Sequence, residues 1–515
     1  MTTTIVDVAV VGSGFAGLGA AIRLTQAGRD VVVLEKGETL GGTWRDNTYP
    51  GCACDVQSHL YSFSFAPNPH WTRRFAPQPE IRAYLEDLAD RYGLRARIRF
   101  GAHVTGAEWD GARWTVRTAD GATVNARAVV WGTGALHQPS IPDIPGLDGF
   151  TGAAFHSAQW DHDLDLRGRR IAVVGTGAST IQFVPRIRAA AASLTVFQRT
   201  PPWVLPKPDG EIPPRLRRLY ARFPAVQKLQ RALVYARNES LVGGFLKPGR
   251  LTVVERFARS YLARTFADRP DLLAKLTPDF MIGCKRILLS NDYYDALAKP
   301  GVEVVTEKIV RVTPTAVVTA DGVEHEVDTI IFGTGFKVAD NLSQVTVTGR
   351  DGVELNDVWR GGREAFLGTM VAGFPNFFVL TGPNTGLGHS SMIYMIESQL
   401  NYVLGALRVL DQHGARAIDT RRDRQDAFNA RIQARLERSV WTQGGCSSWY
   451  LDDDGRNRTL WPDYTFAFRR RTRKVRPADH ELVGWAPVVT EGWSLRGGHC
   501  EGWGTPHSIF GLTPT

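Results

Sequence analysis

A short apolar run that ends in closely spaced glycines occurs twice in this chain of 515 residues. Residues 8–17 read VAVVGSGFAG, and residues 171–180 read IAVVGTGAST. Such a run is typical of a buried parallel strand that turns sharply into a helix, and the N-terminus of that helix can face a pyrophosphate. One copy is a weak signal, but two copies predict two dinucleotide-binding units in one chain.

An acidic residue follows the second predicted strand of the first unit. Residues 31–34 read VVVL, and Glu35 comes next, 18 residues after Gly17. A carboxylate at this place can accept hydrogen bonds from both ribose hydroxyls of an adenosine, although an exposed strand-end glutamate would look the same. The first unit is therefore predicted to bind the ADP part of FAD or NAD. The expected contacts are Gly12, Ser13, Gly14, Phe15, Ala16, Gly17, Glu35 and Lys36.

The second unit differs from the first at the corresponding place. The 163-residue offset between the copies puts Gln198 at the position of Glu35 and Arg199 at that of Lys36. Loss of the acid and gain of a guanidinium is the change expected for a 2′-phosphate, so the second nucleotide is predicted to be NADPH; a solvated Arg199 is the alternative. The expected contacts are Gly175, Thr176, Gly177, Ala178, Ser179, Thr180, Gln198, Arg199 and Thr200, with Thr180 replacing the third glycine.

Composition limits the class of protein. Hydrophobic residues make up 43% of the chain and charged residues 22%, which is typical of a folded globular protein of two to four domains. No apolar run approaches the length of a membrane span, and a strand beginning near residue 5 argues against a signal peptide. The net charge of +9 is interpreted as a solvated surface plus sites for two phosphate-rich cofactors, not as a nucleic-acid surface. The basic residues 469–474 follow an alternating run and are predicted to end an edge strand.

The five cysteines show no metal-ligand spacing, and we expect reduced thiols and a cytoplasmic protein. Residues 41–55 read GGTWRDNTYPGCACD, where glycines and aromatics suit a flat isoalloxazine ring. A disulfide reductase would have a CxxxxC redox pair near here. This chain has Trp44 and a CxC pair, which is too short for an easy disulfide. Cys52 and Cys54 are therefore predicted to be packing thiols.

Several stretches indicate the surrounding elements. A helix is expected at residues 77–92, and a helical insertion at residues 206–282. Strands at residues 128–131 and 326–332 both lead into Gly-Thr-Gly, as expected where the chain crosses between two nucleotide units. Another helix is expected from about residue 391, with its N-terminus toward the flavin.

Two longer motifs resemble the signatures of type I Baeyer–Villiger monooxygenases. Residues 41–55 match GGxWxxxxYPGxxxD in full, and residues 150–161 match FxGxxxHxxxW followed by Asp. The resemblance extends from about residue 5 to about residue 480. Read alone, the histidine and tryptophan of the second motif would be ordinary buried residues. The signature residues are Phe150, Gly152, His156, Trp160 and Asp161.

The resemblance implies an α/β fold with two Rossmann-like domains, in which a discontinuous FAD domain is interrupted by an NADPH domain that has a helical insertion. The expected segments are the first part of the FAD domain (1–150), a signature linker (151–165), the first part of the NADPH domain (166–212), the helical insertion (213–282), the second part of the NADPH domain (283–338), the second part of the FAD domain (339–483) and a loosely ordered tail (484–515). An extra strand in the tail is the alternative.

The resemblance also implies the chemistry. A C4a-peroxyflavin would attack a ketone to give an ester or lactone, with Arg286 stabilising the peroxide anion and Asp55 orienting Arg286. Lys285 would help to hold the 2′-phosphate. The expected partners are a small-molecule ketone and O2, with no metal, no nucleic acid, and a monomer or weak homo-oligomer. Further implied cofactor contacts are Gly42, Thr43, Trp44, Tyr61, Val104, Thr133, Met392 and Trp449; the last two could equally be packing residues.

Three other functions use similar parts. Flavin N- and S-oxygenases share the cofactors, but Arg286 and Asp161 favour the ketone reaction. A pyridine nucleotide–disulfide reductase is made unlikely by the missing CxxxxC pair. A non-catalytic NADPH sensor would not explain Arg286 and Asp55.

Overall fold

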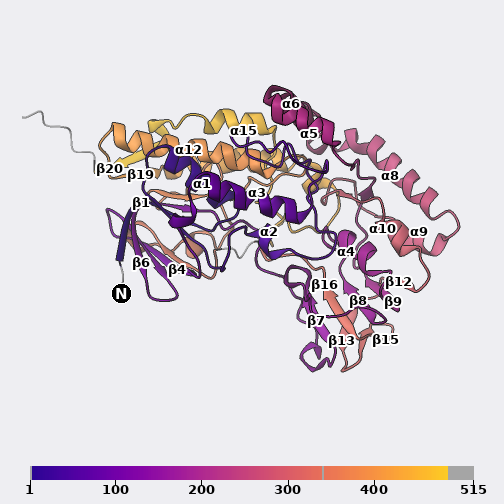
Figure 1. Ribbon diagram of the computed structural model, residues 1–515. Coiled ribbons are helices and arrows are strands. Elements are labelled where there is room, and N and C mark those ends of the chain that lie inside the picture. The colour runs from indigo at the N-terminus through magenta and orange to yellow at the C-terminus, as the bar shows by residue number, and fades with distance from the viewer. Residues whose placement is uncertain (1–2, 339–341, 485–515) are drawn as a thin grey trace, which may run out of the picture.

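The structure is a computed structural model that describes residues 3–338 and 342–484. Its largest sheet has eight strands and draws them from distant parts of the chain (Figure 1). The order is β17-β4-β5-β6-β1-β2-β3, and β18 pairs with β6. The strands are β1 (Thr3–Val11), β2 (Val31–Leu34), β3 (Ile98–Arg99), β4 (Val104–Trp109), β5 (Trp114–Thr118), β6 (Thr123–Trp131), β17 (Thr346–Thr348) and β18 (Phe377–Val379).

The second sheet has five parallel strands in the order β12-β9-β8-β16-β7. It lies beside the large sheet (Figure 1). Its strands are β7 (Ala153–His156), β8 (Arg170–Val174), β9 (Ser193–Phe197), β12 (Val302–Val305) and β16 (Thr329–Phe332). The smaller sheets consist of β13 (Ile309–Val312), β14 (Ala316–Thr319) and β15 (Glu324–Glu326); β10 (Val204–Leu205) and β11 (Leu288–Leu289); and β19 (Ala417–Thr420) and β20 (His480–Val483).

The two glycine repeats fold in the same way. β1 lies between β2 and β6, and β8 lies between β9 and β16, with all neighbours parallel. Gly12 has φ +92° and Gly175 has φ +100°. A Cβ on Gly12 would lie 2.9 Å from the carbonyl oxygen of Gly132, and one on Gly175 would lie 2.7 Å from that of Gly333. In both units the Gly-Thr-Gly crossing therefore packs directly against the first glycine, which confirms the predicted repeat.

Helices cover both sheets, and a helical insertion forms one end of the molecule (Figure 1). The predicted helix at residues 77–92 is observed as α3, and the helix expected from residue 391 as α12. Packed near the large sheet are α1 (Phe15–Gln26), α2 (Thr43–Asp46), α3 (Gln78–Arg91), α11 (Leu355–Val358), α12 (Met392–Gln412), α13 (Arg422–Leu436), α14 (Val440–Gln443) and α15 (Thr465–Thr472). The others are α4 (Thr180–Ile187), α10 (Tyr293–Leu297) and, in the insertion, α5 (Pro214–Arg222), α6 (Pro224–Ser240), α7 (Val242–Leu246), α8 (Thr252–Thr265) and α9 (Pro270–Leu276).

The expectation of an edge strand before the basic run is wrong, because residues 465–472 form helix α15. Thr465, Phe468 and Thr472 are buried at helical spacing, and α15 packs on α12. Nη2 of Arg469 lies 2.9 Å from Oε2 of Glu397 in α12. The local alternation of aromatic and small residues was thus overridden by tertiary packing.

One further expectation is corrected by the structure, and another concerns residues outside the described ranges. The single strand expected at residues 326–332 is interrupted, because β15 ends at Glu326 and β16 begins at Thr329. Residues 485–515 of the expected tail lie outside the described residues. Over the described ranges, none of the helices is long and apolar enough to cross a membrane, and no group of His, Cys, Asp and Glu is placed to hold a metal ion.

The close approach of α1 to its own turn gives a first prediction. A Cβ on Gly17 would lie 1.8 Å from the carbonyl oxygen of Gly12, so Gly17→Ala must push α1 away from β1. We expect Gly17→Ala to lower the free energy of unfolding by about 1–3 kcal/mol, the usual cost of overpacking. Gly149→Ala is the control, since nothing lies within 4 Å of a Cβ there. Equal melting temperatures for the two variants in thermal denaturation would contradict this view.

Candidate functional site

Two glycine segments of the large sheet touch at the start of α1. Gly14 is the N-cap of α1, and a Cβ on Gly42 would lie 3.1 Å from the Cα of Gly14. Gly42 itself has φ +53°. Phe15, Ala16 and Gly17 are buried in the first turn of α1. The result is a surface of bare backbone at a helix N-terminus, which is what a pyrophosphate requires.

Glu35 is buried beside this turn and accepts four hydrogen bonds. The backbone N–H and the hydroxyl of Ser13 donate to Oε2 at 2.9 and 2.7 Å. The backbone N–H of Gly37 and Nη1 of Arg45 donate to Oε1, each at 2.7 Å. Burial alone would raise the pKa of Glu35, but the bonds from Arg45, Ser13 and Gly37 lower it overall. The carboxylate therefore stays ionised at the end of β2.

Arg45 is a residue that the motif analysis missed. It lies directly after Gly-Gly-Thr-Trp and forms ion pairs with Glu35 and Asp46, both at 2.7 Å. Its place inside the signature at residues 41–55 was a visible signal, but that signature is variable at this position. Of the other residues expected at this cofactor, Lys36 is exposed and Val104 is buried at the start of β4.

Aromatic side chains and one hydroxyl line the same region. Trp44, in α2 with Thr43, donates from Nε1 to the Tyr61 hydroxyl at 3.1 Å. Tyr61 meets Phe15 edge-on, with ring centroids 5.1 Å apart. The Thr133 hydroxyl, next to Gly12, is buried and has no hydrogen-bond partner within the described residues. A free buried hydroxyl beside bare backbone fits a polar ligand at this place.

The second glycine turn is open and lies beside two cations. Gly177 and Ala178 are exposed just before α4, and the Thr176 hydroxyl donates to the Thr200 carbonyl at 3.2 Å. Desolvation, followed by the charge of Arg199, lowers the pKa of Lys285. The ammonium of Lys285 and the guanidinium of Arg199 repel each other, and a bound anion would be stabilised by both.

The other residues expected at the second turn are mostly buried. Ser179 and Gly175 are partly exposed, whereas Thr180 is fully buried with an unpartnered hydroxyl. The side chain of Gln198 is 2% exposed, and its Nε2 donates to the carbonyl of Lys275 at 2.7 Å. Gln198 is thus bonded to the helical insertion, which leaves Arg199 as the side chain that faces outward at the end of β9.

Arg286 and Asp55 meet between the two turns, although 231 residues separate them. Nη2 of Arg286 lies 2.7 Å from Oδ1 and 2.6 Å from Oδ2 of Asp55. The Arg286 side chain is 39% exposed and that of Asp55 25%. The charge of Asp55 is the main cause that raises the pKa of Arg286 above its usual value, and Tyr450 adds to it. Because one nitrogen makes both contacts, the N–H groups of Nη1 and Nε can reach other partners.

The signature at residues 150–161 lies in and after β7 and does not contain the ion pair. His156 is fully buried; its Nδ1 accepts from the N–H of Ala158 at 3.1 Å, and burial lowers its pKa. The ring of Trp160 packs against that of Phe183 in α4, with the ring centroids 5.4 Å apart. Asp161 is exposed, and its Oδ1 accepts from the backbone N–H of Asp163 at 3.0 Å. Phe150 is partly buried, and a Cβ on Gly152 would lie 2.4 Å from the carbonyl oxygen of Asp328.

Gln182 of α4 joins the second nucleotide unit to the other signature. The Tyr49 hydroxyl donates to its Oε1 at 3.0 Å, and the N–H of Ala53 donates to the same atom at 3.2 Å. Nε2 of Gln182 donates back to the Ala53 carbonyl at 3.0 Å. A cavity of about 610 Å³ lies beside this contact and is also lined by Lys207. The segment that ends in Asp55 is therefore fixed to α4 only two residues before Asp55.

Met392 and Trp449 have different surroundings. Met392 is partly buried as the first residue of α12. Trp449 is 53% exposed, and its ring lies 4.6 Å from that of Tyr450. Burial raises the pKa of Tyr450 to about 12, while the charge of Arg286 opposes the rise. Trp449 thus adjoins a tyrosine that is close to Arg286.

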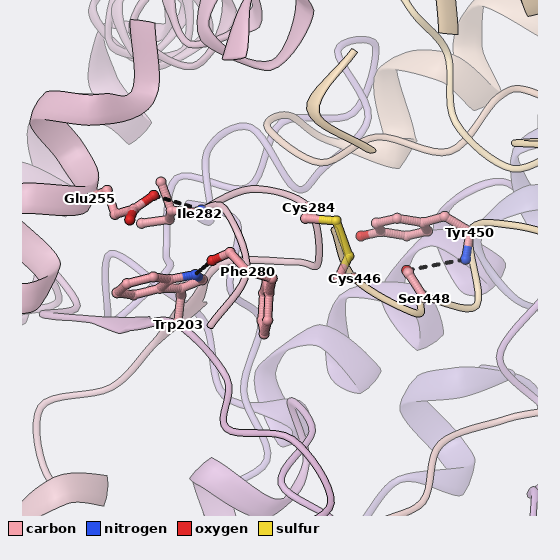
Figure 2. The surroundings of a disulfide bond; sticks show 8 residues. All are labelled: Trp203, Glu255, Phe280, Ile282, Cys284, Cys446, Ser448 and Tyr450. Atoms are coloured by element: carbon pink, nitrogen blue, oxygen red, sulfur yellow. Dashed lines mark hydrogen bonds between the residues drawn. A yellow bond between two sulfur atoms is a disulfide. The ribbon is translucent and has the colours of Figure 1, made fainter. Parts of the chain in front are cut away.

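The expectation of reduced thiols is wrong for two cysteines. Cys284 and Cys446 form a disulfide across 162 residues (Figure 2). Cys52 and Cys54 are free and buried, as predicted for packing thiols, and burial raises the pKa of Cys52 to about 12. Cys500 lies outside the described residues. No local spacing could have indicated a pair so far apart in sequence.

Comparisons with known proteins show related sequences over most of the chain. A family profile described as pyridine nucleotide-disulphide oxidoreductase matches residues 9–230. A protein of Streptomyces coelicolor named Baeyer-Villiger monooxygenase is 53% identical over 488 residues, 94% of each chain. One of the same name from Pseudomonas aeruginosa is 50% identical over 481 residues, 92% of this chain and 91% of its own.

Solved structures give the same result. An oxidized steroid monooxygenase bound to NADP has a TM-score of 0.85 and 32% identity, and the match covers 93% of this chain and all of the other. A closed cyclohexanone monooxygenase has a TM-score of 0.84 and 29% identity, over 93% and 99% of the two chains. Both the sequence and the fold are thus similar to one group of monooxygenases.

Proposed function

This chain belongs to the Baeyer–Villiger monooxygenase family, and we propose that the ion pair between Asp55 and Arg286 is the centre of its reaction. The reaction converts a ketone, NADPH, a proton and O2 to an ester or lactone, NADP⁺ and water. One oxygen atom of O2 enters beside the carbonyl carbon, and the other leaves in water. The observation that most supports the proposal is the bond from Nη2 of Arg286 to both oxygens of Asp55, between the two glycine turns.

FAD is assigned to the first turn. The support is the ionised carboxylate of Glu35, the bare backbone where Gly14 meets Gly42, and the unpartnered Thr133 hydroxyl. Trp44 and Tyr61 provide flat apolar surface for the isoalloxazine ring. When bound, FAD supplies the two-electron and O2 chemistry that amino acid side chains lack.

NADPH is assigned to the second turn. Gly177 and Ala178 leave the start of α4 open for the pyrophosphate, and Arg199 and Lys285 provide two positive charges for the 2′-phosphate. The position of Glu35 is taken in this unit by the neutral Gln198, whose side chain donates to the carbonyl of Lys275. The same phosphate would relieve the repulsion between the two cations.

Arg286 acts as a permanent charge in this mechanism. Its pKa is raised, so it stays protonated at every working pH and is not a proton donor. Asp55 holds Nη2, and the N–H groups on Nη1 and Nε stabilise the negative charge that develops on oxygen at the reacting centre.

The division of the chain into the segments given above is also a proposal, as are a monomeric or weakly associated state, a cytoplasmic location and the absence of nucleic-acid partners. The support for the division is that the large sheet takes β1–β6 from one end of the chain and β17 and β18 from another. The five-stranded sheet uses only strands between them.

The reaction class is tested by its products. We expect NADPH oxidation to rise with a ketone from a panel of linear, cyclic and aromatic ketones, and the product mass to exceed the ketone by one oxygen. Incorporation of ¹⁸O from labelled O2 identifies the source of that atom. A thioether is the comparison substrate. Sulfoxide formation with no ester from any ketone would replace the proposal with S-oxygenation.

Removal of the positive charge separates the two half-reactions. We expect Arg286→Ala to let NADPH reduce the flavin at a near-normal rate but to lower ester formation by about 100-fold or more, as for loss of one oxyanion-stabilising group. Arg256→Ala is the control, since Arg256 is an exposed arginine of α8. Stopped-flow absorbance and product analysis measure the two steps. Normal ester formation in Arg286→Ala would contradict the assigned role.

The choice of nicotinamide cofactor is tested at the two cations. Loss of a charge-assisted hydrogen bond costs about 1.5–3 kcal/mol, so Arg199→Ala should raise KM for NADPH by about 10- to 100-fold. KM for NADH should change little, because NADH has no 2′-phosphate. Lys285→Ala should act in the same direction. Equal reduction rates with NADPH and NADH in the unmodified enzyme would refute the assignment.

A further inference from the structure

The disulfide joins the two loops that meet at the candidate reacting centre. Cys284 comes two residues before Arg286, and Cys446 comes four residues before Tyr450. Figure 2 shows the bond between the loop that follows Phe280 and the loop that leads to Tyr450. Their Cα atoms are 6.1 Å apart. The crosslink therefore connects the segment of Arg286 to the segment of Trp449 and Tyr450.

Arg286 lies in a short irregular segment between two fixed points. On one side is β11, where Leu288 pairs with Val204 and its N–H donates to the Trp203 carbonyl at 2.9 Å. On the other side is Cys284, which is fully buried. Residues 285–287 form no helix or strand. The position of the guanidinium therefore depends on where Cys284 is held.

Hydrogen bonds from other parts of the chain also hold the segment before Cys284, among them one from Nε1 of Trp203 to the Phe280 carbonyl at 3.0 Å (Figure 2). The N–H of Met281 donates to the Gly444 carbonyl at 3.0 Å, and the N–H of Ile282 donates to Glu255 at 3.2 Å. A Cβ on Gly444 would lie 2.5 Å from the Cβ of Cys284, so the backbone of Gly444 packs against the side chain of Cys284. Without the covalent bond, one backbone hydrogen bond between these two loops remains among the described contacts.

We propose that the Cys284–Cys446 disulfide positions Arg286 for oxygen transfer and that its reduction uncouples NADPH oxidation from product formation. The proposal rests on the role assigned to Arg286 above. Asp55 fixes only Nη2, through a contact that is partly exposed, so it cannot by itself fix the backbone of residues 285–287. Cys284 and Cys446 are thus positioning residues, and Arg286 is the group that acts.

Reduction needs a dithiol, and the structure indicates where it attacks. Cys446 is partly exposed and lies between exposed Gly445 and Ser447, whereas Cys284 is buried. A dithiol thiolate forms a bond to the Cys446 sulfur, and the Cys284 sulfur leaves as a thiolate that takes up a proton. The second thiol of the reagent then displaces Cys446. The protein gains two electrons and two protons, and the dithiol becomes a cyclic disulfide.

The first test compares crosslinked and reduced enzyme of the same chain. The holoenzyme is treated with dithiothreitol, excess reagent is removed, and alkylation with mass analysis counts the thiols. We expect anaerobic flavin reduction by NADPH to stay near normal, while oxygenated product per NADPH falls by about 10-fold or more; a misplacement of 1 Å can cost about 100-fold. Hydrogen peroxide should rise by the missing amount. Unchanged coupling in enzyme with a verified open disulfide would overturn the proposal.

A variant provides the matched control and a readout of position. The double variant C284S/C446S should show low coupling before treatment and no response to dithiothreitol, and re-oxidised unmodified enzyme should regain its coupling. Hydrogen exchange of peptides from residues 281–287 should be faster in the reduced enzyme. Unchanged exchange there would overturn the proposal whatever the activity. A parallel loss of flavin reduction, coupling and melting temperature would show a purely structural bond and also overturn it.

These readouts separate this inference from the proposed function. If the unmodified enzyme oxygenates only a thioether, coupling is measured as sulfoxide per NADPH, and the same comparison applies. If it oxygenates neither substrate, the proposed function fails, and hydrogen exchange still shows whether the disulfide holds residues 281–287 in place.

Discussion

The ion pair between Asp55 and Arg286 requires most of the fold to be in place. Asp55 ends the segment 41–55, in which Gly42 packs against Gly14 of the first glycine turn, and Arg286 follows the helical insertion of the second unit. Gln182 holds the Asp55 loop against α4 through three hydrogen bonds. A relative shift of the two nucleotide units by a few ångström would separate the charges, so the ion pair that we propose as the reacting centre forms only when both units pack against each other.

The two glycine units show how one backbone design serves two nucleotides. Their strands have the same neighbours, and Gly12 and Gly175 have nearly the same φ. They differ in the residue that ends the second strand. Glu35 is ionised and held by four donors, whereas Gln198 turns away to Lys275. The adjacent Arg199 is exposed, so the electrostatic preference at this position is reversed by two substitutions without any change in the fold.

Much of this architecture could be predicted because its signals are local. A strand, a glycine turn and a helix lie within 20 residues of each other, and α3 and α12 follow from helical spacing. The family resemblance indicated Asp55, which ends a signature motif, and Arg286, which lies in neither signature; composition indicated neither residue. Arg45 and the Cys284–Cys446 bond were missed because their partners are determined by tertiary contacts, the latter across 162 residues. Helix α15 was missed because its buried face is specified by packing on α12.

The placement of the histidine signature suggests what that motif does. His156 is fully buried, burial lowers its pKa, and its Nδ1 accepts from the N–H of Ala158, so the neutral ring carries its proton on Nε2. Trp160 contacts Phe183 of α4, and Phe183 contacts Tyr49 at 6.1 Å. These contacts link the linker to the same helix that holds the Asp55 loop. In the proposed mechanism the signature therefore contributes packing between the two units, and the proposed charge pair lies outside it.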